Sequence, residues 1–284
     1  MKSTLLLAFV CVAHLLPDSA LSLHIGAFNI QTFGDSKMSN ETISGIIVRI
    51  VSTYDLILVQ EVRDADLSAV QKLMNLLNRV SAEQYNYVVS EPLGRSTYKE
   101  QYLFIYREDQ VSVLDSYLYD DGCEPCGNDT FSREPFVVKF AAPHTEVKEL
   151  VLVPLHTPPA EAVAEIDALY DVYLDVISQW GSQDVLFLGD FNADCSFVRS
   201  DDWPHIRLRT SRDFQWLIPD TADTTVTTTN CAYDRIVAAG PRQRGSIVPG
   251  TARVNDFQKT FGLSYKDALA VSDHFPVEVT LKPL

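Results

Sequence analysis

The stretch VLFLGDFNAD, residues 185–194, joins an apolar run directly to polar side chains. Residues 185–188 have the length and the apolar content of a strand that is buried on both faces. Gly189 follows, and Asp190 and Asn192 then place a carboxylate and an amide just beyond the strand. Because strand ends at one rim of a sheet bring distant parts of a chain together, this stretch predicts a polar site at such a rim.

The same change from apolar to polar recurs along the chain. The other polar residues that border apolar runs are Asn29, Glu61, His156, Asp234, Asp273 and His274. Taken singly, each is typical of a cap, a turn or an exposed side chain. Taken together, imidazoles, amides and carboxylates that converge at one rim predict a metal-dependent hydrolytic site.

Further apolar runs predict an α/β fold. The expected strands cover residues 24–30, 56–59, 102–106, 150–155, 185–188, 235–238 and 276–281. Helical spacing of apolar residues marks residues 43–50, 67–77 and 159–180. Two strand-to-strand connections, within 102–118 and 136–155, are too short for helices and favour mostly antiparallel or mixed sheets. A sandwich of two packed sheets flanked by helices is the natural layering.

The N-terminal segment, residues 1–22, predicts an export signal. A basic residue precedes an apolar run at residues 5–16, and Ala20 and Ser22 have the spacing of a signal-peptidase site, with cleavage after Ser22. In residues 23–284 the absence of a linker or repeat favours a single domain. No later apolar run has the length of a membrane span. We therefore expect a secreted, extracellular monomer.

The cysteines and the glycosylation acceptors fit an oxidising secretory route. Four cysteines follow the predicted signal and allow three pairings. We favour Cys123–Cys126, whose members are close in sequence, together with Cys195–Cys231. A zinc site at Cys123 and Cys126 is the alternative, although no second pair of ligands lies nearby. The acceptors of N-linked glycans are Asn40 in Asn40-Glu41-Thr42 and Asn128 in Asn128-Asp129-Thr130.

The net charge of −15 restricts how the chain could hold a polyanion. An acidic surface repels phosphate backbones, so composition alone argues against a nucleic-acid partner. A polyanionic substrate would need a local basic patch and bound cations.

The strand-end runs resemble the signatures of the endonuclease/exonuclease/phosphatase superfamily. These runs are AFNIQTF at 27–33, QEVRD at 60–64, GDFNA at 189–193 and SDH at 272–274. Within the superfamily, residues 90–95, 119–126 and 231–235 resemble the pancreatic-type deoxyribonucleases. The resemblance implies a four-layered α/β sandwich. It also implies a secreted endonuclease that cuts double-stranded DNA with low sequence specificity and leaves 5′-phosphate and 3′-hydroxyl ends.

The resemblance also implies a catalytic metal centre. Glu61, Asp190, Asn192 and Asp273 would hold Mg²⁺ or Mn²⁺, directly or through water. Such hard oxygen ligands suit these ions better than zinc. Asn29 would orient a phosphate oxygen or a metal-bound water.

Two histidines complete the expected machinery, because an imidazole exchanges protons near neutral pH. By resemblance, Glu100 orients His156 and Asp234 orients His274. We favour His274 as general base and His156 as general acid, and the reverse assignment stays open.

DNA contacts are implied for a small set of residues. By resemblance, Arg63 and Tyr98 enter the minor groove, where they read shape more than sequence. Arg95, Lys99 and Arg133 supply further positive charge beside the site.

Two structural calcium sites are also expected. The first lies inside the Cys195–Cys231 loop, where alternate residues of an extended segment would face one side. Its members are Asp223, Thr225, Thr227 and Thr229. The members of the second, around Cys123–Cys126, are Asp121, Asp129, Phe131 through its carbonyl, and Glu134. The alternative for residues 224–229 is a plain strand edge with turn-forming neighbours.

The sequence is also compatible with three other functions. The same fold could serve a phosphatase or phosphodiesterase on another substrate, such as a lipid or inositol phosphate. A secreted binding protein without catalysis is a different class, and so is an actin-binding protein with secondary nuclease activity. Tyr87 and Val89 match the strand that contacts monomeric actin in some relatives, whereas Phe136 replaces the small alanine usual in those proteins.

Overall fold

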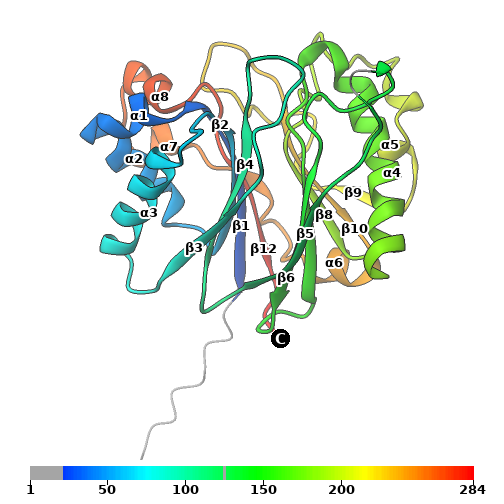
Figure 1. The fold of residues 1–284 in the computed structure, drawn as a ribbon, viewed down its shortest axis with the longest axis horizontal. Coiled ribbons are helices and arrows are strands. Elements are labelled where there is room, and N and C mark those ends of the chain that lie inside the picture. The colour runs from blue at the N-terminus through cyan, green and yellow to red at the C-terminus, as the bar shows by residue number, and fades with distance from the viewer. Residues whose placement is uncertain (1–21, 124–125) are drawn as a thin grey trace, which may run out of the picture.

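Two six-stranded sheets face each other in the computed structural model, which describes residues 22–123 and 126–284 (Figure 1). The predicted export signal lies outside the described residues. The first sheet has the order β11 (Arg253–Val254), β12 (Val277–Leu281), β1 (Leu23–Phe33), β2 (Leu56–Val62), β4 (Gln101–Arg107) and β3 (Tyr85–Val89). The second has the order β5 (Ser112–Leu118), β6 (Phe136–Ala142), β7 (Lys148–Pro154), β8 (Val185–Asp190), β10 (Asp234–Ala239) and β9 (Phe214–Trp216).

Helices cover the outer faces of both sheets (Figure 1). Beside the first sheet lie α1 (Asp35–Ser39), α2 (Glu41–Val51), α3 (Ser68–Val80), α7 (Phe257–Phe261) and α8 (Tyr265–Val271). Beside the second lie α4 (Ala162–Trp180) and α5 (Arg207–Thr210), with α6 (Pro241–Ser246) near its lower end. The predicted four-layered α/β sandwich is confirmed. Among the described helices, none combines the length and the apolar character needed to cross a bilayer.

The central strands are apolar on both faces because each sheet packs against the other sheet on one face and against helices on the other. In β2, Leu56 and Leu58 point into the core between the sheets, whereas Ile57 and Val59 pack beneath the helices of the first sheet. The same alternation places the odd- and even-numbered residues of β7 on opposite sides of the second sheet. This double burial explains why the strands read as continuous apolar runs in the sequence.

Both sheets are mixed, as predicted. β1 pairs with β2 in parallel, and β7 pairs with β8 in parallel, so α2 and α4 serve as crossover helices. The remaining pairings are antiparallel. Parallel neighbours need such long connections, whereas antiparallel β6 and β7 are joined by the short loop of residues 143–147.

Helix starts and short strands differ from the predictions. The helix expected at 159–180 begins with a separate 3₁₀ turn, Pro159–Glu161, before α4 starts at Ala162. Leu67 is not in a helix: it has φ 59° and precedes α3. The start of α3 is set instead by Asp64, whose carboxylate accepts the backbone N–H of Val70 at 2.8 Å. Strands β9 and β11 were not predicted, because they are too short to show an alternation of apolar and polar residues in the sequence.

A buried carboxylate in the strand next to the edge of the first sheet joins side chains from several elements. Glu278 in β12 accepts hydrogen bonds from the Tyr54 hydroxyl and from Arg253 Nε, both at 2.7 Å. His24 Nε2 lies 3.6 Å from the same carboxylate. Burial opposes ionisation of Glu278, but these contacts outweigh it and lower the pKa of this carboxyl to about 2.

This network gives a pH-dependent contribution to stability. Because the pKa of Glu278 is lower in the folded chain than its ordinary value of 4.5, the contribution is present above about pH 5 and is lost as the pH falls toward 2. We predict that Glu278→Gln lowers the free energy of unfolding by about 2–3 kcal/mol at pH 6. The difference from wild type should shrink at pH 3, as measured by urea unfolding. Glu149→Gln, at an exposed carboxylate, is the control. An equal loss at both pH values would contradict the assignment.

Candidate active site

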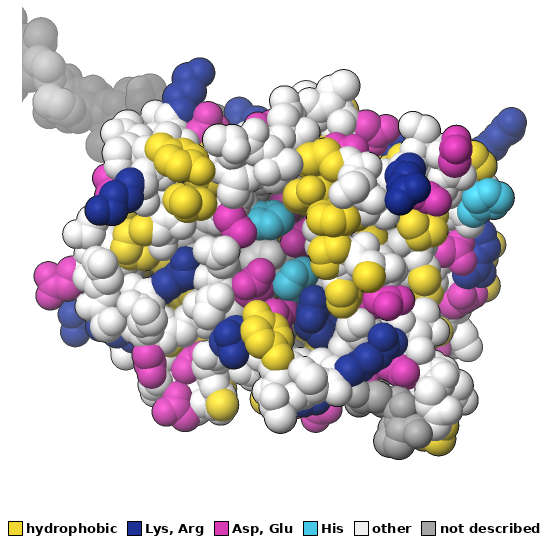
Figure 2. Space-filling view, turned by 90° about the horizontal axis from the view of Figure 1, so that it is seen from above, with side chains coloured by type: hydrophobic (Ala, Val, Ile, Leu, Met, Phe, Trp, Pro, Cys, Tyr) yellow, Lys and Arg dark blue, Asp and Glu magenta, His cyan; other side chains and the backbone are white. Residues whose placement is uncertain are grey.

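The polar residues that end the apolar runs meet at one rim, where the two sheets approach each other. Figure 2 shows two histidine side chains in the centre of this face, surrounded by carboxylates. The residues gathered here are Asn29, Glu61, Glu100, His156, Asp190, Asn192, Asp234, Asp273 and His274. Some come from the first sheet and some from the second, so the site spans the sandwich.

Each histidine is held by a carboxylate at its Nδ1 atom. His156 Nδ1 lies 2.7 Å from Glu100 Oε2, and His274 Nδ1 lies 2.7 Å from Asp234 Oδ2. Both Nε2 atoms face Asp190 Oδ2 at 3.7 Å. The two Nε2 atoms therefore lie equally close to one carboxylate oxygen, where both can take part in proton transfer.

Charge and burial act against each other in both pairs. Burial disfavours protonation of His274, but the carboxylates of Asp234 and Asp190 outweigh it and raise the pKa of this imidazole. Burial likewise disfavours ionisation of Glu100, but the hydrogen bond and charge of His156 outweigh it and lower the pKa of this carboxyl to about 2. Glu100 is therefore an anion throughout the physiological range, and it fixes the orientation of His156.

Backbone irregularities aim the carboxylates at the rim. The pairing register shifts between Asn29 and Phe33 and between Val59 and Val62, which places a bulge next to Glu61. Glu61 has φ 57°, and Asn192 has φ 47°. Left-handed backbone is costly for such residues and is concentrated at functional sites.

The carboxylates are joined by amide donors. Asn29 Nδ2 donates to Glu61 Oε1 at 3.1 Å and to Asp190 Oδ2 at 3.2 Å. The Thr32 N–H donates to Glu61 Oε2 at 2.8 Å, and the Asn192 N–H donates to Asp190 Oδ1 at 2.9 Å. These bonds bring the oxygens of both sheets together despite their like charge.

Several oxygens in this cluster lack a hydrogen-bond partner in the part of the chain that the structure describes. They are Asn29 Oδ1, Asp234 Oδ1 and Asp273 Oδ1, and all three are buried. Buried polar atoms are rarely left unsatisfied, and hard oxygen donors are what Mg²⁺ and Mn²⁺ prefer. The donor set around Glu61 and Asp190 therefore fits a divalent cation.

Two residues of the quoted motifs have contacts that the sequence reasoning did not assign. Ser272 Oγ donates to the Asn29 carbonyl at 2.7 Å and accepts the N–H groups of Gln31 and His274 at 3.2 Å. Gln31 Nε2 donates to Asp273 Oδ2 at 2.9 Å. Both lie beside catalytic candidates in sequence, but only the meeting of β1 with the segment before β12 reveals their contacts.

The residues expected to contact DNA divide into two groups. Arg63 and Tyr98 project from the rim, with the Arg63 guanidinium 4.0 Å from the centre of the Tyr98 ring, which is 41% exposed. Arg133 instead turns inward: its Nε donates to the His156 carbonyl at 2.9 Å and lies 3.2 Å from Glu100 Oε2. Figure 2 shows basic side chains beside the central hollow, around an exposed hydrophobic side chain.

Arg95 and Lys99 are both engaged within the protein. Arg95 Nε forms a 2.8 Å ion pair with Asp129 Oδ2, and Lys99 Nζ donates to the Gly94 carbonyl. Asp121 accepts the backbone N–H groups of Thr130 and Phe131. Among the described residues, Asp121, Asp129 and Glu134 form no three-carboxylate cluster.

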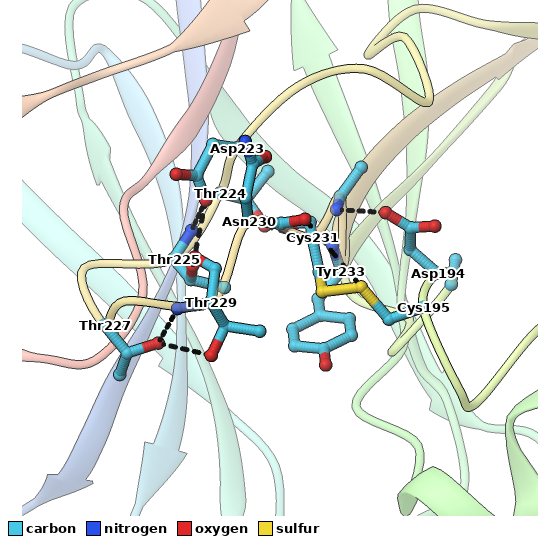
Figure 3. Close-up of a disulfide and its surroundings, with 12 residues drawn as sticks. Asp194, Cys195, Asp223, Thr224, Thr225, Thr227, Thr229, Asn230, Cys231 and Tyr233 are labelled. Atoms are coloured by element: carbon cyan, nitrogen blue, oxygen red, sulfur yellow. Dashed lines mark hydrogen bonds between the residues drawn. A yellow bond between two sulfur atoms is a disulfide. The ribbon is translucent and has the colours of Figure 1, made fainter.

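The first calcium candidate is a loop, not the extended segment that was expected (Figure 3). Asp223 Oδ1 accepts the Thr225 N–H at 3.1 Å and its hydroxyl at 2.8 Å. Thr225 also donates to the Thr229 carbonyl, and the Thr227 and Thr229 hydroxyls meet at 3.0 Å. Local side-chain bonds of this kind bend the chain, which the alternating sequence did not reveal. The four residues nevertheless come together.

This loop is tied directly to the catalytic segment. The Val226 N–H donates to the Asp273 carbonyl at 2.7 Å, and the Phe275 N–H donates to the Thr224 carbonyl at 2.8 Å. The residue between these contacts is His274. The conformation of the Thr-rich loop therefore constrains the backbone that carries one imidazole.

Both disulfides of the favoured pairing are present. Cys123 is bonded to Cys126, which excludes a thiolate zinc site there, and Cys195 is bonded to Cys231 across 36 residues. The second closes the segment that contains the Thr-rich loop. Closing a loop of this length stabilises a fold by about 3–4 kcal/mol in the chain-entropy model.

The remaining surface candidates lie as follows. Asn40 and Asn128, the glycan acceptors, are both exposed. Tyr87 and Val89 are half-buried in β3, the edge strand of the first sheet. Phe136 is 7% exposed and packs in the core between the sheets.

Comparison with known proteins gives a family and close relatives. The model of the endonuclease/exonuclease/phosphatase family matches residues 26–274. Deoxyribonuclease-1 of Sus scrofa is 64% identical over 275 residues, which cover 97% of this chain and 96% of the relative. Deoxyribonuclease-1 of Homo sapiens is 62% identical and covers 98% of both chains. The relative from Gallus gallus is 62% identical over 95% of this chain and 96% of its own.

More distant solved structures share the fold. An endonuclease/exonuclease/phosphatase family protein from Leptotrichia buccalis superposes with a TM-score of 0.62 at 15% identity, covering 92% of this chain and 99% of its own. The human Nocturnin catalytic domain gives a TM-score of 0.61 at 14% identity, covering 93% and 95%. At such identities the likeness concerns the arrangement of sheets and helices.

The Thr-rich loop generates a prediction about calcium. We expect saturating Ca²⁺ to raise the melting temperature by about 5 °C or more, because an ion that binds only the folded chain stabilises it by mass action. Asp223→Asn should abolish most of this rise, while Asp201→Asn, at an exposed position in the same half of the molecule, should leave it intact. Differential scanning calorimetry measures both. A wild-type melting temperature that ignores Ca²⁺ would rule out this site.

Proposed function

The chain belongs to the endonuclease/exonuclease/phosphatase family, and from that premise we propose that it is a divalent-metal-dependent endonuclease that hydrolyses double-stranded DNA. The observation that carries the proposal is the pair of carboxylate-bound histidines whose Nε2 atoms both face Asp190 Oδ2 at 3.7 Å. The close relatives named deoxyribonuclease-1 give the substrate.

The two imidazoles can serve the two proton transfers of phosphodiester hydrolysis. A water oxygen bonds to phosphorus and gives its proton to one Nε2 atom, while the bond from phosphorus to the 3′ oxygen breaks and that oxygen takes a proton from the other. The products are a 5′-phosphate and a 3′-hydroxyl. Because His156 and His274 are placed alike about Asp190, the geometry accommodates His274 as base and His156 as acid, or the reverse.

The acidic cluster supplies the place for the metal. Glu61 and Asp190, with Asn192 and Asp273, would hold Mg²⁺ or Mn²⁺. Once bound, the cation neutralises charge on the phosphoryl oxygens. Asn29 holds Glu61 and Asp190 at a fixed separation through its amide nitrogen. Its Oδ1 atom has no hydrogen-bond partner among the residues that the structure describes, so it can orient a water or a phosphate ligand.

Substrate binding relies on a small part of the surface. The chain carries a net charge of −15, so the duplex meets repulsion away from the rim. Arg63 and Tyr98 form the projecting pair that fits a minor groove, by cation contact and by apolar packing of the ring. Arg133 is close enough to the histidine pair to contact the scissile phosphate, and Arg95 and Lys99 flank this region.

Location, partners and calcium complete the proposal. A predicted signal at residues 1–22, a catalytic domain at 23–284, exposed glycan acceptors and two disulfides fit a secreted monomer. The loop of Asp223 and the loop of Asp121 are the candidate Ca²⁺ sites. Monomeric actin is a second partner class, favoured by Tyr87 and Val89 on an edge strand and opposed by the bulk of Phe136.

Metal dependence is the first test of this function. Purified protein should nick supercoiled plasmid in Mg²⁺ or Mn²⁺, with Ca²⁺ as an aid, and should lose this activity in excess chelator. Readdition of Mg²⁺ should restore it, because the oxygen cluster requires a cation to hold the phosphate. Undiminished nicking in chelator would refute the mechanism.

A second test separates binding from chemistry. We predict that Arg63→Ala and Tyr98→Ala impair plasmid nicking but spare hydrolysis of a small activated phosphodiester, which does not reach the groove-binding pair. His156→Ala and Asp190→Asn should lower both activities by at least about two orders of magnitude. Circular dichroism checks folding of all four variants. Equal losses of the two activities in Arg63→Ala and Tyr98→Ala would place those residues in the chemical step.

A further inference from the structure

Gln60 is a buried amide that connects the two sheets beneath the site. It lies in β2 of the first sheet and is 1% exposed. Its Nε2 atom donates to the Leu155 carbonyl at 2.7 Å, and its Oε1 atom accepts the Asp190 N–H at 2.9 Å. Asp190 is the last residue of β8, and Leu155 directly follows β7, so both partners belong to the second sheet or to its end. One side chain of the first sheet therefore satisfies backbone groups of the second.

The partners of this amide are immediate neighbours of the proposed machinery. Leu155 precedes His156, and the Asp190 N–H belongs to the residue whose carboxylate faces both imidazoles. Gln60 itself precedes Glu61. A single side chain therefore fixes the backbone of three groups that must meet a metal and a phosphate, and these groups come from separate sheets.

The surrounding backbone is shaped to admit the amide. Gly189 has φ +129°, and a Cβ atom placed there would lie 2.4 Å from the Leu155 carbonyl oxygen and 2.6 Å from Gln60 Nε2. Any side chain at Gly189 would push Gln60 away from both partners. On the other side, Glu61 has φ 57° at the bulge of β2, which turns consecutive side chains of that strand out of simple alternation.

We propose that Gln60 is a positioning residue that sets the distance of Glu61 from His156 and Asp190, and this rests on the function proposed above for the same site. The role needs a neutral group that donates at one atom and accepts at the other. Methionine has a similar length and neither capacity. An ionised glutamate would direct a negative oxygen at the Leu155 carbonyl in a buried place, where an unpaired charge is costly.

The test compares Gln60→Met with Gln243→Met. Gln243 is a fully buried amide in α6 whose side-chain atoms have no hydrogen-bond partner among the described residues. Gln243→Met is therefore the same substitution at a buried position, but it removes no hydrogen bond between the two sheets. For Gln60→Met we expect kcat to fall about 10- to 100-fold on both plasmid and the small phosphodiester, as groups that orient metal ligands typically show. KM for DNA should change less than about threefold, because Arg63 and Tyr98 are untouched.

Metal affinity provides a readout that does not depend on activity. Mn²⁺ binding, followed by electron paramagnetic resonance with Ca²⁺ present to occupy the Thr-rich loop, should weaken about tenfold in Gln60→Met and stay unchanged in Gln243→Met. Gln60→Glu, which keeps the shape of the side chain, should show the same weakening at neutral pH and serves if the methionine variant does not fold.

The outcomes distinguish the two proposals. A variant that melts at a lower temperature but keeps its Mn²⁺ affinity and kcat within about twofold of wild type would show that Gln60 only stabilises the fold, and would overturn the positioning role. If wild-type protein fails to nick DNA in Mg²⁺, the proposed function fails, and the Mn²⁺ titration still decides the role of Gln60.

Discussion

The apolar contact between the two sheets is the interaction on which the rest of the molecule depends. Within residues 22–123 and 126–284, no strand of one sheet pairs with a strand of the other, so side-chain volume sets their separation, about 10 Å in packed sheets. Leu58 and Phe104 on one side meet Leu152 and Leu186 on the other within one buried cluster. The site lies at the end of this layer and takes residues from both sheets. A sliding of one sheet over the other would separate its members without breaking a single strand pairing.

Like charge is the second constraint, because several carboxylates share a small buried space. Hydrogen-bond donors offset this repulsion. The Asn29 amide, the Thr32 N–H and the Asn192 N–H donate to the carboxylate oxygens of Glu61 and Asp190. The Arg133 guanidinium adds positive charge beside Glu100, at 3.2 Å from its Oε2 atom. A dication at the remaining oxygens would complete the neutralisation, so affinity for metal and tolerance of close carboxylates have the same origin.

The sequence was sufficient to predict the sandwich and the meeting of the strand ends, because both follow from apolar runs that stop at polar residues. It did not reveal the contacts between elements. Gln60 reads as one more residue of an apolar strand, and its bridging role depends on Gly189, far away in the chain. Leu67 fits a helical spacing but takes a left-handed conformation before α3. The bend in the Thr-rich loop comes from hydroxyl contacts that no pattern of alternation records.

The single projecting pair at the rim, Arg63 and Tyr98, has a consequence for movement along a duplex. Proteins slide when many cations exchange phosphates along a broad contact face. Here the net charge of −15 repels the polymer away from the rim, so under the proposed function the protein would dissociate after each cut and return by diffusion. Cleavage would then be distributive: scission of opposite strands at one place would require independent encounters, and a long duplex would accumulate many single-strand nicks before it fragments.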